Sequence, residues 1–190
     1  DYDPEEIKRH ISISAATAPL EWNGHKLNVI DVPGYFDFEG ELASTLRVVD
    51  SACIVVGAVS GVSVGTEKAW DYCKEYKIPR IMFVNQMDRE NANFNKVIDQ
   101  LKELYGTSIA PFQVPIMEGG EFTGYVDIIA MKAMQFKGKD IIEVPIPDNM
   151  QDEVESIRTI LVEAAAETSE ELMEKYFEGE ELTEEEIRKA

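Results

Sequence analysis

Cys53–Ala58 (CIVVGA) is an unbroken run of apolar and small residues in which three of the six side chains are β-branched. Such a run is typical of a strand buried on both faces within a parallel sheet. Arg80–Asn85 (RIMFVN) is a second apolar run, and Ala69, Trp70 and Cys73 lie between the two at helical spacing. A strand, a helix and a strand in this order predict a parallel βαβ unit.

The same alternation extends outward from this unit. Before it, the pattern predicts strands at Ile11–Leu20 and Lys26–Val32, with a turn at Asn23-Gly24 between them. After it, apolar residues recur at helical spacing from Phe94 to Leu104. We therefore expect the α/β class, with a largely parallel sheet and helices on its faces.

A different pattern begins near Pro111. Four short strands are expected, followed by three helices, the last of which begins with a capping box at Thr183. We place a domain boundary here and predict domains at residues 1–110 and 111–190. The expected strands are Phe112–Met117, Phe122–Ile129, Met131–Phe136 and Ile141–Val144, and the expected helices are Met150–Thr168, Glu170–Phe177 and Thr183–Ala190.

Composition limits the classes of function. The chain of 190 residues is 44% hydrophobic, which argues against wholesale disorder, and its net charge of −19 argues against nucleic-acid binding by charge alone. No apolar run reaches the ~18 residues of a membrane helix. Cys53 and Cys73 are too few for a disulfide framework, and we expect both as reduced thiols in the core of a cytoplasmic protein.

Two loops at strand ends carry residues suited to binding. Asp31-Val32-Pro33-Gly34-Tyr35 follows the strand at 26–32. An aspartate at a strand end can hold hydrated Mg²⁺, and a glycine lets its backbone N–H approach a phosphate closely. Taken alone, this sequence is also a common turn.

Asn85-Gln86-Met87-Asp88 is the second loop. A carboxylate presented there can accept two N–H bonds from one edge of guanine, and this recognition rejects adenine. Alone, the motif could equally be a helix N-cap. Asn85 follows Asp31 by 54 positions, with helix, strand and helix between. That order and spacing are those of the third and fourth signature motifs of a GTP-binding domain.

At this point the chain resembles elongation factor G, and more closely the elongation-factor-G-like proteins among translational GTPases. The resemblance extends over nearly the whole chain. The segments that carry it are Arg9–Thr17, Asp31–Tyr35 with Asp37-Phe38, Leu46-Arg47-Val48, Ala58–Val62, Pro79-Arg80-Ile81, Asn85–Arg89, Phe122–Asp127 and Leu172–Phe177.

The resemblance implies a partial P-loop-GTPase-type domain with an inserted α+β subdomain, using GTP or GDP and Mg²⁺. Asp31 would contact Mg²⁺ through water, and the hydroxyl of Ser12 would ligate it in the GTP state. The N–H of Gly34 would sense the γ-phosphate. Asn85 and Asp88 would read guanine.

Three residues depart from the family pattern. Tyr35 stands where the family has the histidine that positions the attacking water, and a phenol with a pKa near ~10 is a poor substitute, so we expect slow or differently stimulated hydrolysis. Gln86 replaces a lysine that covers one face of the base, which would lower guanine affinity. Ser12 replaces a threonine and keeps its hydroxyl.

The phosphate-binding pattern G-x-x-x-x-G-K-[ST] does not occur in these 190 residues. The resemblance places that loop before residue 1 and the fifth motif after Ala190. We therefore expect a piece of a longer protein that alone binds GTP weakly and does not hydrolyse it. Without its central strand, the sheet would expose edges that can pair with a second copy.

The function implied is that of a piece of an elongation-factor-G-like GTPase that acts on the ribosome in a translocation-type step. One alternative is a ribosome-binding factor whose GTPase activity has decayed. Another is a ribosomal-protection GTPase of the tetracycline-resistance type. The resemblance also implies that the acidic helices of residues 150–190 dock a ribosomal stalk protein.

Overall fold

The computed structural model describes residues 2–190 and divides the chain into two compact units, Asp1–Asn85 and Gln86–Ala190. The predicted domain boundary at residue 110 stays a prediction. The second compact unit begins before it, at Gln86, and includes the helix that precedes residue 110. The elements are α1 (Pro4–Arg9), β1 (Ala16–Trp22), β2 (His25–Asp31), α2 (Glu39–Thr45), β3 (Ala52–Gly57), α3 (Val64–Glu75), β4 (Arg80–Asn85), α4 (Phe94–Tyr105), β5 (Gln113–Glu118), β6 (Glu121–Asp127), β7 (Lys132–Lys137), β8 (Asp140–Val144), α5 (Gln151–Ala166), α6 (Glu170–Phe177) and α7 (Glu184–Lys189).

The first unit contains an antiparallel hairpin of β1 and β2, whose last pair is Trp22 with His25. The turn is Asn23-Gly24, as predicted, and both residues have positive φ, 48° and 76°. Asparagine followed by glycine tolerates this left-handed backbone, which matches the twist of the paired strands. The strand begins at Ala16, five residues later than expected at Ile11.

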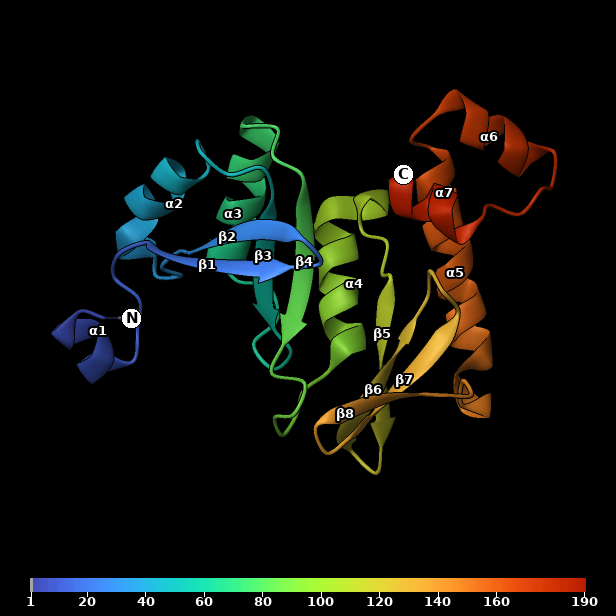
Figure 1. Cartoon of the computed structure of the whole chain (residues 1–190), viewed down its shortest axis with the longest axis horizontal. Coiled ribbons are helices and arrows are strands. Elements are labelled where there is room, and N and C mark those ends of the chain that lie inside the picture. The colour runs from blue at the N-terminus through green and yellow to red at the C-terminus, as the bar shows by residue number, and fades with distance from the viewer. Residues whose placement is uncertain (1) are drawn as a thin grey trace. The chain divides into compact units, whose positions relative to one another are not determined.

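The predicted βαβ unit is confirmed. β3 and β4 pair in parallel, from Ala52 with Arg80 to Gly57 with Asn85, and α3 connects them (Figure 1). In the described part of the chain, β3 and β4 are the only strands that pair in parallel. β2 pairs with β1 in an antiparallel hairpin instead of joining them. The α/β class with helix-flanked parallel strands therefore holds, but the sheet is smaller than expected.

One face of the β3–β4 pair is covered and the other is open. Ile54 and Val56 are buried, whereas Val55, Ile81 and Phe83 are 57%, 52% and 53% exposed. The expectation that β3 is buried on both faces is therefore wrong. It is also wrong for Cys53, which is exposed on this strand, while Cys73 on α3 is buried as expected.

The second unit contains a four-stranded antiparallel sheet in the order β5-β6-β7-β8, which confirms the four predicted strands. Each strand pairs with the next one along the chain. Gly124 lies on β6 opposite β7, and a Cβ at this position would clash with the carbonyl oxygen of Met134. Only glycine fits this contact without moving the neighbouring strand.

The core of the second unit joins this sheet to the three predicted helices, which are also confirmed. Apolar residues from β5, β6 and β7 are buried together with residues from α5 and α7. The buried members are Val114, Ile116, Val126, Ile128, Ala133, Met150, Val154, Leu161, Ala165, Ala166, Leu182 and Ile187.

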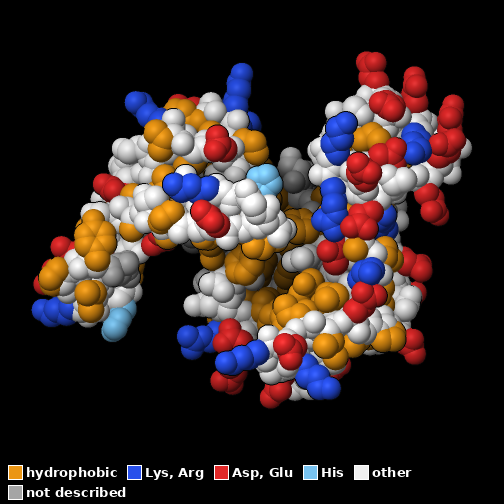
Figure 2. All heavy atoms as spheres, viewed as in Figure 1, with side chains coloured by type: hydrophobic (Ala, Val, Ile, Leu, Met, Phe, Trp, Pro, Cys, Tyr) orange, Lys and Arg blue, Asp and Glu red, His pale blue; other side chains and the backbone are white. Residues whose placement is uncertain are grey.

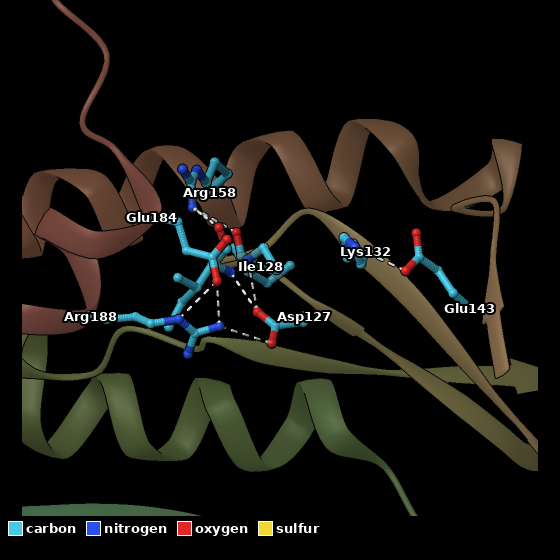
Figure 3. Close-up of polar contacts among 9 residues, drawn as sticks. Asp127, Ile128, Lys132, Glu143, Arg158, Glu184 and Arg188 are labelled. Carbon is cyan, nitrogen blue, oxygen red and sulfur yellow. Dashed lines mark hydrogen bonds and ion pairs between the residues drawn. The ribbon is translucent and has the colours of Figure 1, made fainter. Parts of the chain in front are cut away.

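Polar contacts fasten α5 and α7 to the connection between β6 and β7 (Figure 3). The guanidinium of Arg158 donates to the carbonyl oxygens of Ile128 and Ile129 at 2.8 and 2.9 Å. Asp127 accepts from the N–H of Ile129 at 2.9 Å and lies 3.8 Å from the guanidinium of Arg188. The two arginines therefore connect backbone and carboxylate groups of this turn to two different helices.

The charge of the second unit is concentrated at its C-terminal end. Residues 148–190 carry a net charge of −11, and on the face drawn in Figure 2 many acidic side chains, with a few basic ones among them, gather over α6 and α7. Thr183 begins α7 with the predicted capping box, in which Glu186 accepts from the N–H of Thr183. Among the described residues, no helix has the length and apolar content needed to cross a membrane.

Candidate functional site

Ser12 and Asp31, the two residues proposed from sequence as Mg²⁺ contacts, lie side by side in the first unit. The hydroxyl of Ser12 donates to Oδ2 of Asp31 at 3.3 Å. Asp31 is the last residue of β2, and Ser12 belongs to the segment that leads into β1. Because β1 and β2 pair along their whole length, the hairpin brings these two positions, 19 residues apart, to the same end.

The loop after Asp31 presents its backbone and one aromatic side chain. Pro33 is buried and anchors the loop, whereas Gly34 is exposed and Tyr35 is 58% exposed. A Cβ at Gly34 would meet no described atom within 4 Å. The carbonyl oxygen of Gly34 lies 3.5 Å from the position that a Cβ on Gly65 would take, so the loop runs along the first turn of α3.

Beyond Tyr35, the chain is held against α3 by Lys68. Its ammonium lies 3.8 Å from the centroid of the Phe36 ring and donates to Glu39 at 2.7 Å. Tyr72 also donates its hydroxyl to Glu39, at 2.6 Å. The hydrogen bond from Lys68, followed by that from Tyr72, lowers the pKa of Glu39, and the same carboxylate raises the pKa of Tyr72. These contacts fix the far end of the loop that carries Tyr35.

The segment containing Ser12 is held by two carboxylates. Glu6 accepts from the N–H groups of Ile13 and Ser14 at 2.8 and 3.1 Å, and Glu41 accepts from the N–H of Ala15 at 2.8 Å. The hydrogen bonds from Ile13 and then Ser14 are the main cause that lowers the pKa of Glu6 to about 2. These carboxylates thus bind the three N–H groups that immediately precede β1, which begins at Ala16.

Asn85 is the last residue of β4, and the chain turns directly after it at Gln86-Met87-Asp88. Gln86 has a positive φ of 63°, and its carbonyl oxygen accepts from the N–H of Arg89 at 3.1 Å. Met87 is buried, while the side chains of Asn85, Gln86 and Asp88 are exposed. The buried methionine anchors a turn that presents its polar residues to solvent.

The alternative in which this motif caps a helix is wrong. Asn93 caps α4, accepting from the N–H of Lys96 at 2.9 Å. Asn85 and Asp88 precede that helix and are separate from its cap.

The donor set at Ser12 and Asp31 suits a hard cation. Mg²⁺ prefers oxygen ligands and is usually held by one or two protein groups, with water and phosphate completing its shell. One hydroxyl and one carboxylate within 3.3 Å fit this requirement. In residues 2–190, no group of three or more His, Cys, Asp or Glu side chains is placed to hold a metal by itself.

Sequence reasoning missed α1 and, with it, Glu6. The signal was present: Asp3 is followed by Pro4 and, three positions after the cap, by Glu6, which is a helix-start pattern. It also missed Lys68 and Glu39, whose contact spans 29 positions and leaves no local signature.

Two comparisons place the chain among known proteins. A family model described as the elongation factor Tu GTP binding domain matches residues 1–181. Among solved structures, the crystal structure of ttk003000868 from Thermus thermophilus is similar, with a TM-score of 0.91 and 35% sequence identity. The match covers 100% of this chain and 28% of that one, so the chain spans less than a third of the length of this relative.

Proposed function

The chain belongs to the elongation factor Tu GTP-binding domain family, and from this premise we propose that Asp31, Ser12, Gly34, Asn85 and Asp88 bind GTP or GDP together with Mg²⁺. The family makes a guanine nucleotide the class of ligand. The roles of the individual residues are the proposal, and each is supported by a feature of the structure.

The observation that carries the proposal is the contact between Ser12 and Asp31. Two oxygen-bearing side chains from distant parts of the sequence meet at 3.3 Å at the end of the β1–β2 hairpin. Mg²⁺ would supply positive charge that offsets the charge of the phosphates. Ser12 and Asp31 would orient the ion, Ser12 directly and Asp31 through water.

Gly34 would approach the terminal phosphate with its backbone N–H. The space around its Cα supports this role, because a side chain at Gly34 would meet no described atom within 4 Å and φ is not in the left-handed region. Neither packing nor backbone conformation therefore requires glycine here. Close approach of a ligand to the main chain would account for a glycine at this position.

Asn85 and Asp88 would read the base. Both side chains are exposed: Asn85 ends β4, and Asp88 lies on the following turn, which contains the buried Met87. Asp88 would accept hydrogen bonds from the two N–H groups on one edge of guanine. Adenine does not present this pair of donors. Gln86 replaces the lysine stem of the resembling family and would cover the base less completely.

For the whole protein, we propose GTP hydrolysis coupled to a translocation-type step on the ribosome, in the cytoplasm. This rests on the family and on similarity to a chain of which ours spans 28%. The acidic surface of α6 and α7 supports docking of a ribosomal stalk protein as part of the same proposal.

The direct test is nucleotide binding by the full-length protein. A fluorescent GDP analogue is titrated with and without Mg²⁺ and then displaced with GTP or ATP. Displacement by GTP but not by ATP is the expected result. Equal displacement by ATP, or no binding in either buffer, would contradict the proposal.

Asp88→Asn tests the residue assigned to the base. The amide would donate where guanine also donates, so GTP affinity should fall by at least tenfold, whereas xanthosine triphosphate, which presents an oxygen at that position, should bind more tightly than in the wild type. Asp99→Asn on the exposed surface of α4 is the matched control and should change neither affinity.

Tyr35 supports a second candidate, a ribosome-binding factor with decayed GTPase activity. Its side chain is 58% exposed, and its phenol stands where the resembling family has a histidine. Ribosome-stimulated hydrolysis by the full-length protein separates the two functions. Hydrolysis stimulated by ribosomes favours the GTPase, whereas tight guanine binding without turnover favours the decayed factor.

A further inference from the structure

Glu6 is a buried carboxylate on a short helix whose other residues are exposed. Only 2% of Glu6 is accessible to solvent. A buried carboxylate is costly unless donors surround it. Four backbone N–H groups do so here, from Tyr2, Asp3, Ile13 and Ser14, at 2.8 to 3.1 Å.

The two oxygens of Glu6 have different partners. Oε2 accepts from the N–H groups of Tyr2 and Asp3 and completes the capping box of α1. Oε1 accepts from the N–H groups of Ile13 and Ser14, seven and eight residues further along the chain. The capping box requires only the bond from the N–H of Asp3, so the pair of bonds at Oε1 performs a separate task.

That second pair holds the backbone immediately after Ser12. Ile13 and Ser14 are bound by Glu6, and the N–H of Ala15 is bound by Glu41 at 2.8 Å. With three consecutive N–H groups fixed, the direction of the Ser12 side chain is limited, and its hydroxyl meets Asp31 at 3.3 Å. The backbone donors, Ile13 and Ser14 first, favour the ionised form of Glu6 and lower its pKa to about 2.

We propose that Glu6 is a positioning residue for the Ser12 hydroxyl, which it holds beside Asp31 for Mg²⁺ binding. The inference rests on the proposed function, in which Ser12 contacts the ion. Glu6 itself contacts neither ion nor nucleotide. It acts through the backbone of Ile13 and Ser14, to which its Oε1 atom is bonded.

The test compares Glu6→Gln with Glu5→Gln in the full-length protein. The glutamine in Glu6→Gln keeps the size of the side chain but presents an NH₂ group to donors in place of one oxygen. Glu5 neighbours Glu6 on α1, is exposed and pairs with Arg9 at 2.9 Å, so its substitution removes the same charge without touching residues 12–15. Glu6→Asp, with a shorter reach, replaces Glu6→Gln if circular dichroism shows that the latter does not fold.

Two readouts are measured. Hydrogen exchange at the amides of Ile13 and Ser14 should be at least tenfold faster in the Glu6 variant and unchanged in Glu5→Gln. The factor by which Mg²⁺ tightens binding of a fluorescent GDP or GTP analogue should fall about tenfold, while affinity in EDTA stays at the wild-type value. A role limited to helix capping would leave this Mg²⁺ factor unchanged.

Ser12→Ala completes the cycle. It should lower the Mg²⁺ factor as Glu6→Gln does, and the double variant should lose no more than either single variant because both act through one hydroxyl. If Mg²⁺ tightens nucleotide binding by the Glu6 variant as much as it does for the wild type, this inference alone is overturned. If the wild-type protein binds no guanine nucleotide, the proposed function is overturned as well. The two failures are distinguished by the binding data for the wild type.

Discussion

The guanidinium group of Arg80 lies over the indole ring of Trp70, with Cζ 3.7 Å from the ring centroid. The contact joins the first residue of β4 to α3 and so fastens the crossover helix to the parallel strands. Arg80 is half-buried and its Nε atom has no hydrogen-bond partner in the described structure, so the indole ring offers this part of the guanidinium a cation–π contact.

Trp70→Ala should therefore destabilise the first unit. Trp70 is 9% exposed, and its removal leaves both a cavity and an arginine without its aromatic partner. We expect a loss of about 3 kcal/mol in the free energy of unfolding, measured by urea denaturation with circular dichroism. Trp22→Ala is the control: Trp22 is 64% exposed at the hairpin tip, and its loss should leave the urea midpoint almost unchanged. Equal effects of the two substitutions would contradict the packing described.

Gly124→Ala should destabilise the second unit. A methyl group at Gly124 would clash with the carbonyl oxygen of Met134, so β6 and β7 would have to separate. The expected loss is about 3 kcal/mol in urea unfolding. Gly40→Ala is the comparison and should raise the free energy of unfolding. A Cβ at this position meets no described atom within 4 Å, and alanine favours the helical conformation of α2. An unchanged urea midpoint in Gly124→Ala would mean that the strands are further apart than the structure places them.

Glu186 predicts a dependence of stability on pH in the second unit. Hydrogen bonds from Lys175 and then Thr183 lower the pKa of its carboxyl group from 4.5 to about 2. Because the folded-state pKa lies below the unfolded value, the stabilisation is fully present above pH 4.5 and is lost as the pH falls toward 2. Thermal unfolding should show wild type more stable than Glu186→Gln at pH 7, with the difference shrinking between pH 4.5 and 2.

Glu185→Gln controls for the loss of one acidic charge from the same helical turn. Glu185 is exposed, so this substitution should leave the pH profile of thermal unfolding close to that of the wild type. A profile for Glu186→Gln that runs parallel to the wild type at all pH values would refute the assignment.

Much of the second unit could be predicted because its signals are local. Short apolar runs separated by Gly119-Gly120 and Lys137-Gly138 mark adjacent antiparallel strands, and the capping residues of α6 and α7 appear in the sequence beside the helices they begin. The Asn23-Gly24 turn was predictable for the same reason, since this dipeptide favours the positive φ values that the hairpin requires.

The first unit was less predictable because its decisive contacts are distant in sequence. Apolar residues along β3 gave no indication that alternate side chains are exposed, and they misplaced Cys53 in the core. The motifs identified Asp31 and Asp88, and the resemblance added Ser12. Neither indicated the carboxylates that hold the Ser12 segment: the helix-start pattern around Glu6 does not reveal its second pair of bonds, and Glu41 meets Ala15 across 26 positions.

The pairing of β5, β6, β7 and β8 in chain order also bears on how the second unit forms during synthesis. Each strand finds its partner as soon as the next short segment leaves the ribosome, without waiting for a distant part of the polypeptide. Low contact order of this kind favours rapid folding. The sheet can thus assemble vectorially as a platform, onto which α5 and then α7 close last and bury its apolar face.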